Sequence, residues 1–128
     1  MSPMQRPLSE PMMTFELQPQ IEQLRADESY QRSGRLGRTL ARSGRLRLVL
    51  VVLSADVEVG THQADSPMTI QLVEGRIGFR IHGEDHELRA GQVLFFEAGE
   101  AHDIRALEET ALLLTLSAVG DDARNADG

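Results

Sequence analysis

The sequence predicts an all-β barrel or sandwich that is preceded by one short helix. From Arg38 onward, short apolar or alternating segments recur at the spacing of roughly eight to twelve residues that is typical of such folds. Glycine-containing turns separate these segments, at Gly60, Gly75, Gly83, Gly91 and Gly99. A chain of 128 residues is long enough for one domain with its own core.

One short helix is predicted near the start of the domain and is expected to end before Tyr30. Pro19 lies close to its expected first turn, where proline is well tolerated. Apolar residues recur there at the three- to four-residue spacing of a helix face: Phe15, Leu17, Ile21 and Leu24. The domain is expected to cover residues 14–117. Residues 1–13 are rich in proline and residues 118–128 are small and acidic, so both are predicted to be disordered.

The strands are predicted from apolar runs and alternation. Leu46–Leu53 is apolar at nearly every position, which indicates a strand buried on both faces. Gly83 predicts a hairpin, because glycine adopts a positive φ at little cost. His82 and His86 flank it and are predicted to be exposed turn residues. Six further strands are predicted: Met68–Val73, Arg76–Ile81, His86–Arg89, Val93–Phe96, His102–Ala106 and Ala111–Leu116.

Composition restricts the class of function. The net charge of −7 argues against nucleic acid as a partner. The absence of cysteine excludes disulfides, thiolate metal sites and cysteine nucleophiles. No apolar run is long enough to cross a membrane. We therefore expect a cytoplasmic protein that binds neither nucleic acid nor membrane.

Arginines are concentrated in the segment between Ser29 and Ala55, which contains no acidic residue. Such a cluster can bind an acidic partner or an anionic ligand. The default interpretation, however, is a charged outer strand or a salt-bridged subunit interface. The arginines are Arg32, Arg35, Arg38, Arg42, Arg45 and Arg47.

Two glycine–histidine patterns carry a resemblance to a known family. His62 lies thirteen residues before Gly75, and Gly91, Gly99 and His102 follow the pattern G-x7-G-x2-H. These spacings resemble the two motifs of the cupins, and residues 38–117 resemble a small single-domain cupin. The resemblance implies a cupin double-stranded β-helix, which is a jelly-roll-like barrel.

The first motif is incomplete in this sequence. In cupins with the full motif, three histidines and a glutamate bind one divalent metal ion. Here Ala64 and Met68 occupy the positions of the second histidine and the glutamate, and Glu97 stands where the second motif has proline. By this match only His62 and His102 carry over as metal ligands, for a Zn, Fe, Mn or Ni ion.

We expect the barrel to bind a small molecule or a weakly held divalent metal ion. Gln71 and Met68 are candidate ligand-binding residues, although strict alternation places Gln71 on the opposite strand face from Met68. The alternative is a metal-dependent cupin enzyme of dioxygenase or isomerase type with a reduced ligand set. A third interpretation makes a histidine a general base that is oriented by Asp65 or Glu97. The resemblance also implies a homodimer that pairs through an outer sheet face.

Overall fold

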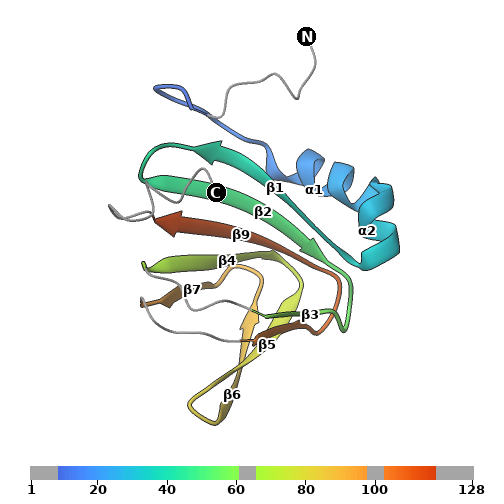
Figure 1. Cartoon of the computed structure of the whole chain (residues 1–128). Coiled ribbons are helices and arrows are strands. Elements are labelled where there is room, and N and C mark those ends of the chain that lie inside the picture. The colour runs from blue at the N-terminus through green and yellow to red at the C-terminus, as the bar shows by residue number, and fades with distance from the viewer. Residues whose placement is uncertain (1–8, 61–65, 98–102, 118–128) are drawn as a thin grey trace.

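The computed structural model describes residues 9–60, 66–97 and 103–117, and within them two antiparallel sheets form a barrel with two helices outside it (Figure 1). The predicted all-β barrel with a short N-terminal helix is therefore confirmed. The predicted leader and tail lie largely outside the described residues. The elements are α1 (Leu17–Ala26), α2 (Glu28–Ser33), β1 (Arg35–Arg42), β2 (Leu46–Leu53), β3 (Glu58–Gly60), β4 (Met68–Glu74), β5 (Arg76–Ile81), β6 (Glu84–Arg89), β7 (Val93–Phe96), β8 (Asp103–Ala106) and β9 (Thr110–Ser117).

The sheets contain five and four strands. The larger sheet has the order β1-β2-β9-β4-β7, and the smaller has the order β3-β8-β5-β6. The strand β2 pairs with β9 over its whole length, from Leu46 opposite Ser117 to Leu53 opposite Thr110. Its apolar run is therefore explained by a central position in the larger sheet.

Two strands were not among those predicted from apolar patterns, although the arginine segment was expected to form a charged outer strand. The first, β1, is rich in arginine and contains Gly37, yet it pairs with β2 from Arg35 to Arg42 with one bulge near Leu40. The second, β3, is only three residues long. Both are edge strands, so their structure depends on the neighbouring strand more than on their own propensity.

The N-terminal helical region is broken at Asp27, which corrects the single-helix prediction. Asp27 has an extended backbone and ends α1. Its carboxylate accepts a hydrogen bond of 2.8 Å from the backbone N–H of Ser29 and so caps α2. Tyr30 therefore lies inside the second helix, where it is buried. An aspartate at this position is a helix-start signal that the sequence contains.

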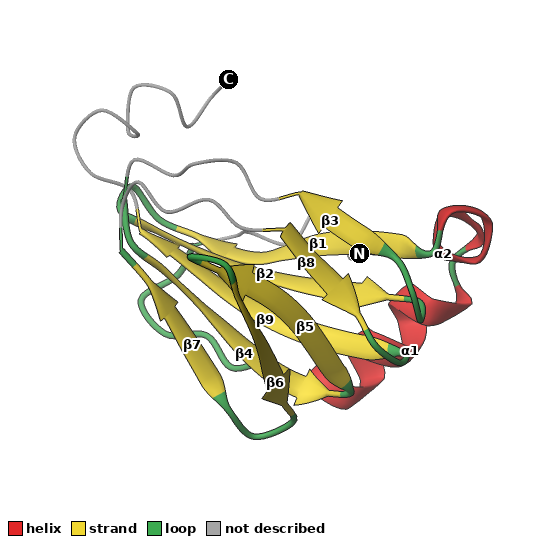
Figure 2. Ribbon diagram, turned by 90° about the horizontal axis from the view of Figure 1, so that it is seen from below, coloured by secondary structure: helices red, strands yellow, loops and turns green. Residues whose placement is uncertain are grey.

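The side chains form two cores on opposite faces of the larger sheet. The helices pack on its outer face and bury Ile21 and Leu24 against Leu50 and Val52. Both helices lie toward the same end of the strands (Figure 2). The barrel interior is a second cluster: Leu53, Ile70, Leu72, Ile77, Phe79, Leu88, Phe96, Ile104, Ala106 and Leu112.

The two ends of the barrel are formed by different turns, and we name them the closed end and the open end. At the closed end, Gly75 joins β4 to β5 with a φ of 89°. A Cβ atom there would overlap the Glu109 carbonyl and the Thr110 hydroxyl, so only glycine fits this crossing. The open end is formed by the opposite ends of the same strands, including Gly60, Met68 and Ser117.

Candidate functional site

A row of neighbouring side chains crosses the inner face of the larger sheet at the open end. Arg42 pairs with Arg47, Arg47 with Leu116, Leu116 with Met68, and Met68 with Phe96. Directly paired residues share a face of the sheet. Met68 and Phe96 belong to the interior cluster, so the whole row faces inward. We call these five residues the rim row.

The rim row changes from charged to apolar along its length. Arg42 and Arg47 are exposed at one side, and Leu116 and Met68 are half-buried in the middle. Phe96 is buried at the other side, 5% exposed. The row therefore places two cations next to an apolar surface.

The interior below the rim row is apolar and incompletely buried. Val59, Met68, Ile81, Leu94 and Leu114 pack against the interior cluster, yet each is only partly buried. By contrast, Leu53, Leu72 and Ile77 at the closed end are at most 1% exposed. Most of these partly buried side chains lie toward the open end, although Val51 and Val57 are also only partly buried.

The structure separates the two predicted ligand-binding residues. Met68 lies on the inner face and contributes to the barrel interior. Gln71 is exposed and alternates with Ile70 and Leu72, which are buried in that interior. Gln71 therefore lies on the outer face of β4.

The predicted metal ligands His62 and His102 lie outside the described residues. Within residues 9–60, 66–97 and 103–117, no three His, Asp or Glu side chains are grouped so that they could hold a metal ion. Met68 occupies the position at which the first cupin motif has glutamate. Its thioether is a poor ligand for hard divalent ions. The described residues therefore do not form a metal centre on their own.

A comparison with protein families identifies the fold family. A family model described as "Cupin domain" matches residues 47–118, which is more than half of the chain. The chain belongs to the cupin domain family. No helix among the described residues of this cupin is long and apolar enough to span a membrane.

Solved structures with the same fold have low sequence identity to this cupin. A protein of unknown function from Streptococcus pyogenes is 24% identical, with a TM-score of 0.62, over 68% of this chain and 76% of that one. An RmlC-like cupin from Shewanella frigidimarina is 22% identical, with a TM-score of 0.62, over 70% of this chain and 81% of that one. KdgF from Halomonas sp. is 23% identical, with a TM-score of 0.61, over 70% of this chain and 84% of that one. No curated protein matches the chain. These similarities show the fold alone.

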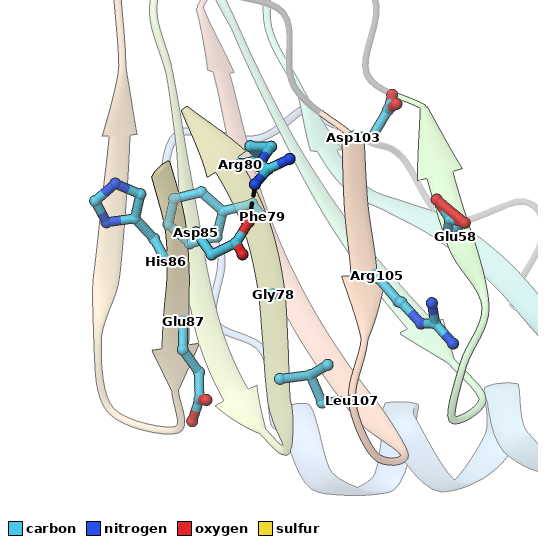
Figure 3. A pocket seen from close by; sticks show the side chains of 10 residues that line it. All are labelled: Glu58, Gly78, Phe79, Arg80, Asp85, His86, Glu87, Asp103, Arg105 and Leu107. Atoms are coloured by element: carbon cyan, nitrogen blue, oxygen red, sulfur yellow. Dashed lines mark ion pairs between the residues drawn. The ribbon is translucent and has the colours of Figure 1, made fainter. Parts of the chain in front are cut away.

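A shallow groove of about 700 Å³ lies against the smaller sheet of this cupin and was not predicted (Figure 3). Gly78 lies in its floor, where the missing side chain leaves space beside Leu107. Arg80 pairs with Asp85 at 3.0 Å, which the figure marks. The remaining lining side chains are Glu58, Phe79, His86, Glu87, Asp103 and Arg105.

Several charges of this groove are paired within the protein. Arg105 contacts Asp56 at 3.3 Å, and Glu87 contacts both Arg76 and Arg89 at 3.1 Å. The guanidinium groups of Arg76 and Arg89 hold the pKa of Glu87 below its usual range. The groove therefore combines ion pairs with the carboxylates of Glu58 and Asp103, which have no ion pair among the described residues.

The two histidines near the hairpin have different positions. His82 lies in the turn, as predicted, with a φ of 52°. His86 lies within β6 and stacks on Phe79, with ring centroids 5.5 Å apart. The sequence spacing alone did not show this contact, because it depends on the β5–β6 register that pairs the two residues.

Proposed function

We propose that this cupin binds a small organic molecule whose apolar part lies in the open end of the barrel, without converting it. The observation that supports the proposal is the difference between the two ends of the interior. The most deeply buried residues of the cluster, such as Leu72 and Ile77, lie toward the closed end, whereas Met68 and Leu114 remain partly accessible. Small-molecule sites are lined predominantly by apolar side chains of this kind.

Binding without turnover is favoured by the chemistry of the described interior. Catalysis needs a positioned acid, base, nucleophile or metal. The interior cluster consists of hydrophobic side chains, and the described residues lack a three-ligand metal group. An apolar interior supplies affinity through burial but no reactive group.

A metal-dependent enzyme is a second candidate function, and one strand pairing favours it. Gly60 is paired with Asp103 at the end of β3 and β8. In the sequence, His62 follows Gly60 by two residues and His102 directly precedes Asp103. The described residues nearest in sequence to both predicted ligands are therefore paired, which supports a shared site.

Titration calorimetry with octan-1-ol tests the proposed binding. We expect the alcohol to bind, and Met68→Gln to weaken it roughly tenfold, because a buried unpaired amide costs about 1–3 kcal/mol. The matched control is Gln71→Ala on the outer face of the same strand, which should leave affinity unchanged. Failure of octan-1-ol to bind, or equal affinity in Met68→Gln, would contradict the proposal.

We further propose that two copies of the chain pair through β7. The edge strands β1, β3 and β6 all carry charged side chains, whereas β7 reads Val-Leu-Phe-Phe. Val93 and Phe95 on its outer face are 59% and 58% exposed. An uncharged, exposed edge favours pairing with another strand. Antiparallel pairing of β7 with its own copy is self-complementary, as a two-fold dimer requires.

A further inference from the structure

We propose that Arg42 and Arg47 bind the anionic group of the ligand, so that the ligand is an organic carboxylate or phosphate ester with an apolar body. This inference rests on the proposed function and specifies its substrate class. It combines two independent observations, the lack of charge partners at the two arginines and their position in the rim row.

The first observation is the contrast between these arginines and seven others among the described residues, while Arg35 and Arg45 also lack a side-chain partner there. Arg25, Arg32, Arg76, Arg80, Arg89 and Arg105 each form an ion pair with a carboxylate, and Arg38 donates hydrogen bonds to Gln20 and Gln23. Among residues 9–60, 66–97 and 103–117, neither Arg42 nor Arg47 has such a partner for its side chain. The two guanidinium groups are therefore available to an external anion.

The second observation is that Arg42 and Arg47 are directly opposite each other. Like charges in this arrangement destabilise a sheet. The chain as a whole is acidic, with a net charge of −7, yet no acidic residue lies within the segment between Ser29 and Ala55. A bound anion would relieve the repulsion that the protein itself leaves uncompensated.

The direction of the two side chains connects them to the barrel. Side chains alternate along a strand, so Arg47 shares its face with Val51 and Leu53. Leu53 is part of the interior cluster and Val51 packs against it. Arg42 shares this face as the cross-strand partner of Arg47. Both arginines therefore lie on the inner face, at the end of the sheet where β4 begins and β9 ends (Figure 1).

The spacing suits a ligand with a charged head and an apolar body. Arg47 and Met68 are separated by β9 only, so at the usual strand spacing their backbones are roughly 10 Å apart. An anion at the arginines thus leaves the attached apolar body over Leu116 and Met68. Guanidinium groups bind carboxylates and phosphates through paired, parallel hydrogen bonds.

The turn that joins the two arginines is held in place before any ligand binds. The backbone N–H of Ser43 donates to the Leu46 carbonyl at 2.8 Å. The Ser43 hydroxyl accepts from the backbone N–H groups of Arg45 and Leu46 at 3.2 and 3.1 Å. A fixed hairpin tip reduces the ordering cost of binding.

Calorimetry with three probes tests the inference on the full chain. Octanoate and octan-1-ol share an apolar body and differ in the anionic group, and inorganic phosphate supplies an anion without a body. We expect octanoate to bind about tenfold more tightly than octan-1-ol, and inorganic phosphate to bind more weakly than either. The double substitution Arg42→Gln, Arg47→Gln should remove the advantage of octanoate and leave octan-1-ol affinity unchanged.

Arg35→Gln is the matched control, because Arg35 is also an exposed arginine of β1 without a described ion pair but pairs with Leu53 at the closed end. It should leave the affinity for all three probes unchanged. Equal affinities for octanoate and octan-1-ol, with both bound, would overturn the inference while the proposed function stands. Phosphate binding as tight as octanoate binding would also overturn it. A double variant Arg42→Gln, Arg47→Gln whose oligomeric state changes while its affinities for the three probes do not would overturn it as well. Failure of both octyl probes to bind would overturn the proposed function itself.

Discussion

Arg42 and Arg47 lie directly opposite each other in the β1–β2 ladder, and neither forms an ion pair among the described residues. Removing one charge should therefore stabilise the protein when no ligand is present. We expect Arg42→Gln to raise the free energy of unfolding by about 0.2–1 kcal/mol, which is the usual size of a cross-strand charge effect. Urea denaturation at low and high salt measures it. The gain should shrink as salt screens the repulsion, and a salt-independent gain would indicate a different cause.

The turn at Gly75 should be intolerant of any side chain. A Cβ atom at this position would overlap the backbone of Glu109 and Thr110, and the φ of 89° is itself unfavourable for other residues. We expect Gly75→Ala to lower the free energy of unfolding by roughly 2–4 kcal/mol through overlap and backbone strain. Gly44→Ala is the control, because nothing lies within 4 Å of its added Cβ. Equal denaturation midpoints for the two variants would contradict this account.

Tyr30 should make the fold sensitive to alkaline pH. Burial raises the pKa of this phenol above its usual value of 10.0, and the nearby Glu109 carboxylate, which accepts its hydrogen bond at 2.9 Å, raises it further. The folded state therefore holds this proton at a pH where the unfolded chain has lost it. The free energy of unfolding should fall as the pH rises above about 10. Tyr30→Phe should reduce that slope in denaturation curves measured between neutral and alkaline pH, and an unchanged slope would exclude Tyr30 as its source.

The parts of the fold that the sequence predicted are those with strong local patterns. The apolar run of Leu46–Leu53 and the glycine turns identified most strands, because burial and positive φ restrict residue choice. The strand β1 has no such pattern and is defined by its pairing with β2. The break at Asp27 was missed although its capping role has a sequence signal.

The candidate site was less predictable because it depends on register. Alternation along β4 separated Met68 from Gln71 in the sequence, and the structure agrees. The rim row, however, joins residues from five strands, and only Arg42 and Arg47 are close together in the chain. No local spacing indicates that Arg47 lies two strands away from Met68. The arginine cluster was visible in the sequence, but the inner-face position of Arg42 and Arg47 was not.

The proposed dimer predicts that charges on the outer face of β7 will separate the subunits. Val93→Lys combined with Phe95→Lys should give a monomer, because burying unpaired cations at an interface is costly. Both side chains are more than half exposed, so the fold should be retained. Sedimentation velocity over a range of protein concentrations measures the change. Met12→Lys, at an apolar position that is 82% exposed, is the control. A parent chain that is monomeric at every concentration would refute the dimer.

Metal content distinguishes the binding protein from the metal-dependent enzyme. Because Ala64 and Met68 replace two ligands of the full motif, we expect the untagged protein to hold well under one equivalent of divalent metal. Restoring both ligands with Ala64→His and Met68→Glu should raise the content toward one equivalent, since a zinc or iron site needs about three protein ligands. Elemental analysis of purified protein measures both. Stoichiometric metal in the parent chain that is lost in the variant His62→Ala, His102→Ala would instead establish a metal centre and favour the enzyme.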